Sequence, residues 1–241
     1  MVGRTGRRDD ASLGSDTHLT YIVYVLDNQN ACGKWYGGVM DQTKPEKSRR
    51  EENTEATREA LLTAGRDLFA KEGYQATGME AISRAARVTR GAFYHHFEDK
   101  RALFDAVVVS MQSDVATRVE RAARTQPKIW DRLGEGLGAY LDACLEPAYG
   151  RIVIQEAPAV LGHGRYREIE EAYPMALLIG TMNALKRDGE IVCEDPDLLA
   201  RMVDAMICRA ALMLAETDDP RRLRRRVLRM VDVMLAAFRK P

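Results

Sequence analysis

The chain has 241 residues, of which 46% are hydrophobic, so it is long enough to bury a substantial core as one large domain or two smaller ones. Lysine plus arginine and aspartate plus glutamate both total 36, and this balance excludes a protein that binds polyanions through its overall charge. The cysteines Cys32, Cys144, Cys193 and Cys208 form no Cys-x-x-Cys pair, and no apolar run approaches the roughly 18 residues of a membrane span, so we expect a cytoplasmic protein without a metal cluster or membrane contact.

Residues 1–43 differ in composition from the rest of the chain. They are mostly polar and contain one strand-like apolar run, Leu19–Leu26. A signal peptide is not expected, because acidic residues precede this short run and no small-residue cleavage site follows it. A lone β-strand beside helices would expose its edges. We therefore interpret residues 1–43 as a disordered or non-native extension, with the native start at Met40, in preference to a functional extension.

The next two segments lead into the most informative part of the sequence. Lys44–Arg50 is a basic arm, for which a solvated tail is the favoured interpretation and a contact with DNA phosphates or the minor groove is the alternative. The first helix is predicted from about Thr54 to Glu72, with an apolar stripe through Leu61 and Phe69. Gly73 can supply its left-handed stop. This helix would brace the two shorter helices that follow.

Residues 77–100 predict two short helices joined by a tight turn. Thr77 and Glu80 have the Thr-x-x-Glu spacing of a capping box at the start of the first helix. Arg87 interrupts the apolar pattern, and Thr89 is placed to cap the second helix. Two short capped helices joined in this way predict a helix-turn-helix, the second helix of which enters a DNA major groove.

The second short helix and its flanks carry side chains that suit DNA. The fork of Arg90 matches O6 and N7 of guanine, and we favour base reading and a plain phosphate contact equally for it. Tyr94, His96 and Lys100 can each donate a hydrogen bond to a phosphate oxygen. His95 and His96 point about 100° apart on a helix, so they cannot share one metal ion and no metal is expected. The predicted DNA-binding set is Thr77, Thr89, Arg90, Gly91, Tyr94, His95, His96 and Lys100.

About fifty residues of this region resemble the DNA-binding domain of the tetracycline-repressor (TetR) family of bacterial transcriptional regulators. The matching residues include the Tyr-x-His-Phe-x-x-Lys run and are Ala60–Phe69, Gly73, Tyr74, Thr77, Ile82, Ala85, Ala86, Val88, Gly91, Phe93, Tyr94, His96, Phe97, Lys100 and Leu103. Arg87 departs from the family pattern, which usually has glycine in the inter-helix turn. Arg87 either accepts a left-handed conformation at a cost of roughly 1 kcal/mol or reshapes the turn.

Downstream of the motif, helical periodicity continues to the end of the chain. The predicted segments are 99–124, 130–144, 152–160, 166–187, 197–216 and 222–239. Pro174 lies inside one of them and should kink or split it. The last two segments are separated by a short turn, so they should pack as an antiparallel pair. The fold class is therefore predicted to be all-α. A three-helix DNA-binding domain at residues 44–97 would precede a helical domain at residues 98–241, which the resemblance implies is a ligand-binding and dimerisation domain.

The last helix pair has more apolar surface than one packing face requires. Ordinary core packing is one explanation, and the resemblance favours another, in which the pair joins its twin in a homodimeric four-helix bundle. Methionine-rich surfaces adapt well to such packing. The predicted interface residues are Met202, Met206, Ala210, Met213, Val227, Met230, Met234 and Phe238.

The resemblance also implies a pocket for a small molecule in the downstream domain. The candidates for its lining combine aromatic and polar side chains, although core packing is the favoured role for any single one of them. They are Trp130, Tyr140, Gln155, His163, Tyr166, Tyr173 and Met182. The sequence contains no recognisable catalytic triad or nucleotide-binding glycine loop, so we expect neither an enzyme nor a cofactor.

Together these observations predict a homodimeric repressor that binds a near-palindromic operator in double-stranded DNA, and the resemblance implies that a small-molecule effector releases it. One alternative is a DNA-binding dimer without small-molecule input, which a protein partner would regulate. A helical enzyme that carries the motif is a more remote alternative.

Overall fold

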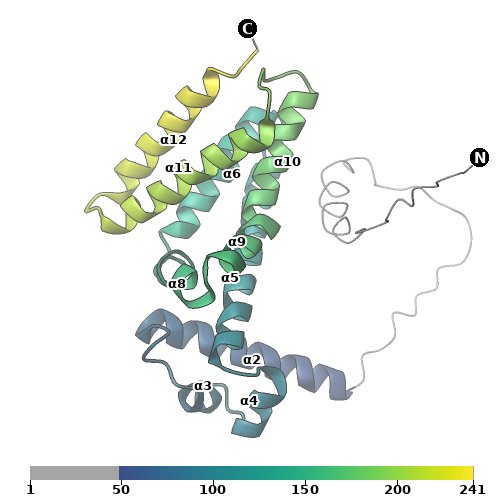
Figure 1. Ribbon diagram of the computed structural model, residues 1–241, viewed down its shortest axis with the longest axis vertical. Coiled ribbons are helices and arrows are strands. Elements are labelled where there is room, and N and C mark those ends of the chain that lie inside the picture. Colours follow the sequence, from purple (N-terminus) through teal and green to yellow (C-terminus); the bar gives the residue numbers. More distant parts are fainter. Residues whose placement is uncertain (1–48, 241) are drawn as a thin grey trace, which may run out of the picture. The chain divides into compact units, whose positions relative to one another are not determined.

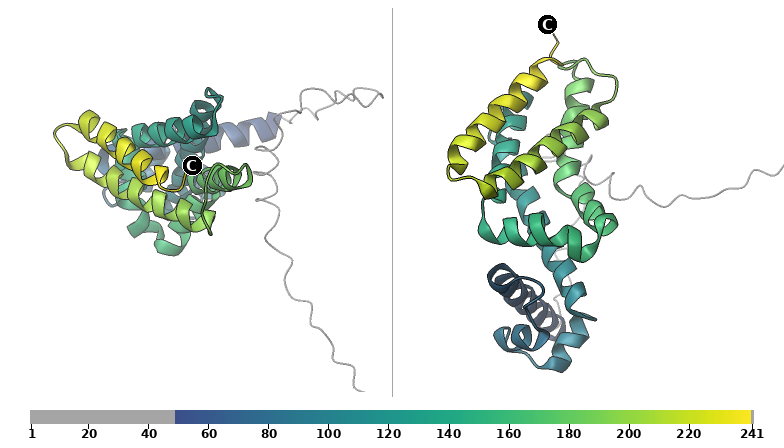
Figure 2. Two further views of the ribbon diagram at one scale, coloured as in Figure 1. Left: turned by 90° about the horizontal axis from the view of Figure 1, so that it is seen from above. Right: turned by 60° about the vertical axis from the view of Figure 1, so that its left-hand side comes forward.

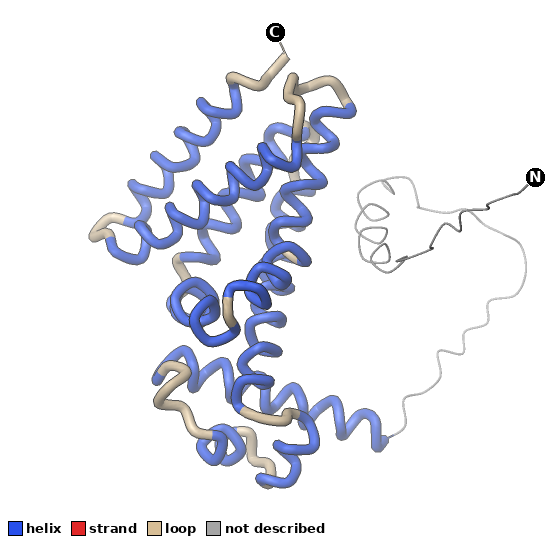
Figure 3. Tube along the Cα trace, viewed as in Figure 1, coloured by secondary structure: helices blue, strands red, loops and turns tan. Residues whose placement is uncertain are grey.

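The computed structural model describes residues 49–240, and this part of the chain forms helices without any strand (Figure 3). The predicted all-α class is confirmed. The extension at residues 1–43 and the basic arm as far as residue 48 lie outside the described residues. None of the described helices combines the length and apolarity that crossing a membrane requires.

The first three described helices lie together (Figure 1). They are α2 (Arg49–Glu72), α3 (Met79–Ala85) and α4 (Arg90–His96). Leu61, Phe69, Ile82 and Phe93 are fully buried between them and the start of the next helix. Gly73 ends α2 with a φ of 87°, as the sequence predicted, and α2 begins a few residues earlier than expected.

The long helix α5 (Lys100–Arg124) connects this three-helix group to the rest of the chain (Figure 1). Asp99 caps it, because the Asp99 carboxylate accepts a hydrogen bond from the backbone N–H of Ala102 at 2.7 Å. One face of α5 is buried from Leu103 to Val115, and the helix packs against both α2 and α6. A displacement of α5 would therefore move both α2 and α6.

Six shorter segments follow α5 along the chain. They are α6 (Ile129–Cys144), α7 (Pro147–Tyr149), the π-helix η1 (Gly150–Glu156), α8 (Ala157–Leu161), α9 (His163–Ala172) and α10 (Pro174–Arg187). Pro174 splits the predicted 166–187 segment into α9 and α10, because its ring nitrogen cannot donate a helical hydrogen bond. The π-helix was not predicted from the sequence, since its apolar residues are also compatible with an α-helix.

The chain ends in the predicted antiparallel pair, α11 (Pro196–Glu216) and α12 (Pro220–Ala236), which lie side by side in Figures 1 and 2. Asp195 caps α11 and Asp219 caps α12, each through its carboxylate. After α12 the chain returns to the loop that follows α10, where Val192 donates its backbone N–H to the carbonyl oxygen of Phe238 at 2.8 Å.

Candidate functional site

The turn between α3 and α4 is a Schellman motif with Arg87 in the left-handed position, at a φ of 56°. The backbone N–H of Val88 donates to the carbonyl of Ser83 at 2.9 Å, and that of Arg87 donates to the carbonyl of Arg84 at 3.1 Å. Of the two alternatives that the sequence left open at Arg87, the structure has the left-handed one. The turn keeps its geometry even though arginine replaces the usual glycine.

Helix α4 is then fixed by one cap and one buried ring. The Thr89 hydroxyl oxygen accepts a hydrogen bond from the backbone N–H of Ala92 at 3.1 Å, which confirms the predicted cap. Phe93 is fully buried and anchors the inner face of the helix. Because Phe93 packs on the inner face, the opposite face of α4 remains exposed to solvent.

Arg90, Gly91, Tyr94 and His95 make up this exposed face. The guanidinium carbon of Arg90 lies 5.7 Å from the centre of the Tyr94 ring, and an Arg90 nitrogen lies 3.5 Å from a Glu80 carboxylate oxygen. An ion pair this exposed contributes little and exchanges readily for another anion. The guanidinium is therefore held near the helix surface and is available to a base edge or a phosphate.

The fold does not require glycine at position 91. A Cβ atom there would meet only the Thr89 hydroxyl oxygen, at 3.8 Å, which is an ordinary contact. Glycine inside a helix costs roughly 0.5–1 kcal/mol relative to alanine. What Gly91 provides in return is a helix surface that a large partner can approach closely, as DNA would in the major groove.

His96 lies at the edge of this face and is half-buried. Burial lowers its pKa, with smaller contributions from the neighbouring His95 and Arg58. Near neutral pH His96 is therefore a neutral imidazole with one N–H to donate, rather than a cation. The described residues contain no group of histidine, cysteine and acidic side chains that could hold a metal ion.

Thr77 is buried in the loop between α2 and α3. It is only 1% exposed, and its hydroxyl donates to the carbonyl of Gly73 at 2.7 Å. The predicted capping box is wrong, because Gly78 is the N-cap of α3 and no side chain caps that helix. The hydroxyl of Thr77 is already used by the turn that ends α2, so this side chain is not available to DNA.

Lys100 is also used inside the fold. Its ammonium group donates to the carbonyl oxygens of Tyr74 at 2.8 Å, Thr77 at 2.9 Å and Gln75 at 3.4 Å. It also lies 4.3 Å from the centre of the Tyr74 ring. An ammonium has three donors, and these carbonyls occupy all of them. The geometry contradicts the predicted phosphate contact and assigns Lys100 to holding the loop between α2 and α3.

The π-helix grips the same loop from the downstream side. One Arg151 nitrogen donates to the carbonyls of Ala70 and Lys71, at 3.1 and 2.9 Å, at the end of α2. Glu156 accepts a hydrogen bond from the backbone N–H of Tyr74 at 2.9 Å. Both side chains close over Gly73, where a Cβ would lie 2.7 Å from Arg151 and 2.8 Å from Glu156. We call Arg151 and Glu156 the π-helix clamp.

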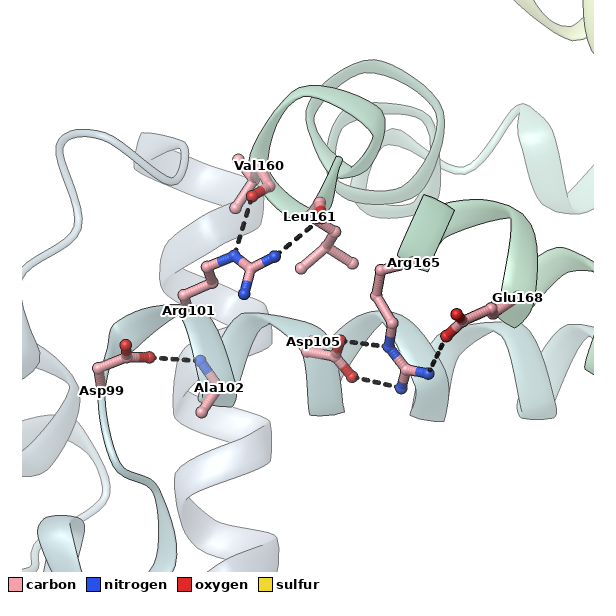
Figure 4. A network of polar contacts seen from close by, with 8 residues as sticks. All are labelled: Asp99, Arg101, Ala102, Asp105, Val160, Leu161, Arg165 and Glu168. Atoms are coloured by element: carbon pink, nitrogen blue, oxygen red, sulfur yellow. Dashed lines mark hydrogen bonds and ion pairs between the residues drawn. The ribbon is translucent and has the colours of Figure 1, made fainter. Parts of the chain in front are cut away.

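A second set of contacts joins α5 to α8 and α9 (Figure 4). Arg101 donates to the carbonyl oxygens of Val160 and Leu161, at 3.2 and 2.8 Å, where α8 ends. Arg165 of α9 forms a two-pronged ion pair with Asp105 of α5, at 2.7 and 2.9 Å. The first turns of α5 are thus tied to the downstream helices by directional polar contacts as well as by packing.

A buried polar cluster lies deeper in the downstream half, where α5, α6, α7, α9 and α11 converge. The Tyr149 hydroxyl donates to the side-chain oxygen of Gln112 at 2.7 Å, and the ring centres of Tyr149 and Tyr140 are 6.4 Å apart. Burial raises the pKa values of both tyrosines. We use the name buried polar cluster for two groups of side chains: the buried Gln112, Tyr140, Cys144 and Tyr149, and the half-buried Tyr166, Glu170, Asp204 and Cys208.

The acidic members of the cluster are perturbed by their surroundings. Burial is the main cause that raises the pKa of Glu170 to about 7, while a hydrogen bond with Tyr166 opposes that rise. Burial also raises the pKa of Asp204, whose carboxylate lies 3.7 Å from the Cys208 sulfur. Perturbed carboxyl groups of this kind are concentrated at functional sites, although structural networks also contain them.

The predicted ligand residues fall in different places. Tyr140 and Tyr166 belong to the buried polar cluster, and Met182 is fully buried. Gln155 and His163 are exposed, and Tyr173 is partly buried just before α10. Trp130 contacts Glu190 and Arg239, beside the end of α12. The sequence did not single out Gln112, Tyr149, Glu170 or Asp204, which lie on separate helices and share no local spacing.

The predicted dimer residues divide by exposure. Met202, Met213, Met230 and Met234 are between 41% and 63% exposed, so they are available to a partner. Met206, Val227 and Phe238 are partly buried. Ala210 is only 4% exposed and packs inside its own chain, so it does not contribute to a free surface.

Comparison with known proteins agrees with this geometry. Residues 61–107 match the model for bacterial regulatory proteins of the tetR family, and residues 130–238 match the model for the tetracyclin repressor-like C-terminal domain. The Tn10 TetC protein of Escherichia coli is 26% identical over 170 residues, which cover 69% of this chain and 84% of TetC.

Solved structures show the same similarity. A TetR-family transcriptional regulator from Pectobacterium atrosepticum is 31% identical, with a TM-score of 0.65, and the match covers 79% of this chain and 98% of that one. RolR, solved in complex with resorcinol, is 22% identical with a TM-score of 0.59 over 77% of this chain and 92% of its own. The protein is therefore a helix-turn-helix transcriptional regulator that binds DNA. It belongs to the TetR family.

Proposed function

We propose that the protein is a homodimeric repressor that binds a near-palindromic operator in the cytoplasm and is released by a small molecule. Residues 44–97 form its DNA-binding domain and residues 98–241 its regulatory domain. The observation that carries the proposal is the exposed face of α4, where Arg90, Gly91 and Tyr94 lie together on a helix anchored from behind by Phe93.

The exposed methionines of α11 and α12 support the dimer. Met230 is 63% exposed and Met234 is 45% exposed, both on α12. Val231 and Leu235 of the same helix are buried against the rest of the chain. A second copy of the pair would cover these side chains in a four-helix bundle. Two-fold symmetry would then place two α4 helices in successive major grooves about 34 Å apart, and the operator would have matching symmetry.

The contacts of α5 support the release step. The helix is tied to α8 by Arg101 and to α9 by Arg165, and the π-helix clamp holds the loop that α5 also holds through Lys100. A ligand that rearranges the downstream helices would therefore displace the DNA-binding helices. It must bind the DNA-incompetent state more tightly, and such coupling is typically 1–3 kcal/mol. RolR, which shares the fold, has been solved with resorcinol bound.

Selection from a random duplex library tests the DNA-binding part of the proposal. We expect an inverted repeat, bound by two copies of the chain. Met230→Asp should yield monomers in sedimentation and weaken operator binding, because it places a charge in the proposed interface. Val192→Asp is the matched control, since Val192 is 67% exposed but lies outside the helix pair. Recovery of asymmetric sites bound by a single copy would contradict the proposal.

The alternative of a DNA-binding dimer without a small molecule makes a different prediction. In that case no small molecule would alter operator binding, and the buried polar cluster would be structural. An effector that stabilises the protein and weakens operator binding in parallel would exclude this alternative.

A further inference from the structure

We propose that the exposed face of α11 and α12 binds a second copy of the chain in one orientation only, with the positively charged end of each helix pair against the negatively charged end of the other. This inference rests on the proposed function, because it takes the dimer from there. It adds the orientation of the two copies and the residues that select the partner.

The two ends of the helix pair carry opposite charges. Residues 216–229, where α11 ends and α12 begins, contain five exposed arginines against three acidic residues, an excess of two positive charges. Residues 186–197, where α10 ends and α11 begins, contain five exposed acidic residues against Lys186 and Arg187, an excess of three negative charges. We call these segments the basic end and the acidic end. The 21 residues of α11 separate them by about 30 Å (Figures 1 and 2).

The basic end has arginines that are available to a partner. Arg222 and Arg226 are exposed, and neither side chain has an ion pair or a hydrogen bond with another described residue. They are four positions apart, and the same spacing continues to Met230 and Met234, so these four side chains lie on one stripe of α12. The stripe therefore changes from charged to apolar along the helix.

The acidic end has carboxylates in an open depression of the surface. The residues that line the depression include Asn183, Lys186, Arg187, Glu194, Asp195 and Asp197. Its two basic side chains already have partners, since Lys186 donates to the carbonyl oxygen of Glu194 at 2.6 Å and Arg187 pairs with Asp188. The Glu194 side chain is exposed and has no polar contact with another described residue. An arginine of a second copy would meet an unpaired carboxylate there.

Apolar side chains occupy the surface between the two ends. On α11, Leu198 is 53% exposed and Met202 is 56% exposed, and on α12 Met230 is 63% exposed and Val233 is 69% exposed. A second copy would cover these side chains in either orientation, because burial of apolar surface is not directional. The apolar surface therefore favours association without selecting how the two copies are arranged.

The charged ends distinguish the two orientations. If the helices of the two copies run in opposite directions, two-fold symmetry places each basic end against the acidic end of the other copy, and the favourable contact occurs twice. If the helices run in the same direction, each end meets its own like, and like charges repel. A foreign chain without this order of charges is disfavoured in the same way. The surface is thus complementary to itself in one orientation, as self-association requires.

Sedimentation of the full chain at two salt concentrations tests the contribution of the charges. We expect the dissociation constant of the dimer to rise about tenfold between about 50 and about 500 mM salt, because salt screens exposed ion pairs. Arg222→Gln together with Arg226→Gln should weaken the dimer at low salt and reduce this salt dependence. A wild-type dimer that salt strengthens or leaves unchanged would overturn the inference.

Charge reversal tests the orientation. Arg222→Glu with Arg226→Glu, and separately Glu194→Lys with Asp197→Lys, should each weaken the dimer at low salt at least about tenfold. A mixture of the two double variants should form heterodimers of nearly wild-type affinity, because the two altered ends are again opposite in charge. Native mass spectrometry identifies the mixed species. Double variants that dimerise as tightly as the wild type, or a mixture that does not recover, would overturn the inference.

Arg221→Glu with Arg225→Glu is the matched control. These arginines precede Arg222 and Arg226 by one position, so they point about 100° away from the stripe that contains Met230. The control should dimerise nearly as the wild type does, and circular dichroism checks the folding of every variant. If it weakens the dimer as much as Arg222→Glu with Arg226→Glu, the effect is one of total charge and the proposed orientation is wrong. If Met230→Asp still dimerises as the wild type does, the interface in the proposed function is wrong, and this inference is overturned with it.

Discussion

The DNA-binding end is built from residues that are close together in the sequence, whereas the buried polar cluster is built from residues that are far apart in the sequence. The helix-turn-helix depends on contacts a few residues apart, such as the cap that Thr89 provides for α4 and the turn around Arg87. The cluster draws one or two residues from each of five helices, and the Gln112–Tyr149 hydrogen bond spans 37 positions. The first kind of site can be recognised in a sequence, whereas the second becomes visible only when the helices have packed.

Lys100 belongs to the DNA-binding end, but its contacts are with residues distant in sequence. Its substitution should have the largest effect on stability. Lys100→Met should lower the free energy of unfolding by about 3 kcal/mol, because it removes charged hydrogen bonds to the carbonyls of Tyr74 and Thr77. Chemical denaturation measures this loss. Lys71→Met, at an exposed position of α2, is the control and should be nearly neutral. Unchanged stability together with a smaller salt dependence of DNA binding would restore the phosphate contact and contradict the supporting role.

The π-helix clamp should have the next largest effect. Arg151→Met removes the hydrogen bonds to the carbonyls of Ala70 and Lys71, and we expect it to cost about 2 kcal/mol of stability. If a ligand weakens operator binding by the wild type, Arg151→Met should also reduce the effect of that ligand on operator affinity. Arg167→Met on α9 serves as the control, since Arg167 is exposed. Full coupling in Arg151→Met would separate the clamp from the release step.

Substitution of Arg87 in the turn should have a smaller effect on the free energy of unfolding, and it should stabilise the protein. Arg87 has a φ of 56°, which glycine adopts without a steric penalty. We expect Arg87→Gly to raise the free energy of unfolding by up to about 1 kcal/mol. Arg84→Gly is a useful contrast, because Arg84 lies in the regular part of α3 and the substitution should be destabilising there. A destabilised Arg87→Gly would show that the Arg87 side chain makes a structural contact.

Glu170 should affect the pH dependence of stability. Its pKa is about 7 in the folded protein, above its usual value of 4.5, so the folded state binds the proton more tightly than the unfolded state. Stability should therefore fall as the pH rises from about 4.5 to about 7. Denaturation midpoints of Glu170→Gln should lack this component. A wild-type profile that is no steeper than that of Glu170→Gln over this range would contradict the assignment.

Much of the DNA-binding end was predictable because its signals are local. Gly73 ends α2 and Thr89 caps α4 through contacts with residues at most four positions away, and both were predicted correctly. Thr77 was misread, although its spacing to Glu80 fits a capping box. The preceding turn offered the Thr77 hydroxyl a carbonyl acceptor, and that contact replaced the cap.

The remaining errors come from contacts between segments that are distant in sequence. Lys100 reaches carbonyls 23 to 26 positions earlier, so its sequence neighbours gave no indication that its donors were occupied. Ala210 has the helical spacing of an interface residue, but it lies on the face of α11 that its own chain covers. Tyr140 and Tyr166 stand out in the sequence by their chemistry, whereas Gln112 stands out only in the structure, where its buried side-chain nitrogen has no hydrogen-bond partner among residues 49–240.

We propose that the exposed face of α4 reads DNA while the residues behind it hold that face in place. Binding-site selection with purified wild type and Arg90→Ala tests it most directly. We predict that Arg90→Ala keeps the wild-type melting temperature, loses about 1–3 kcal/mol at the operator and loses its preference at one base position in each half-site. If Arg90→Ala keeps its full base preference, Arg90 only positions the protein on DNA, and the proposal that Arg90 reads a base on the exposed face of α4 is wrong.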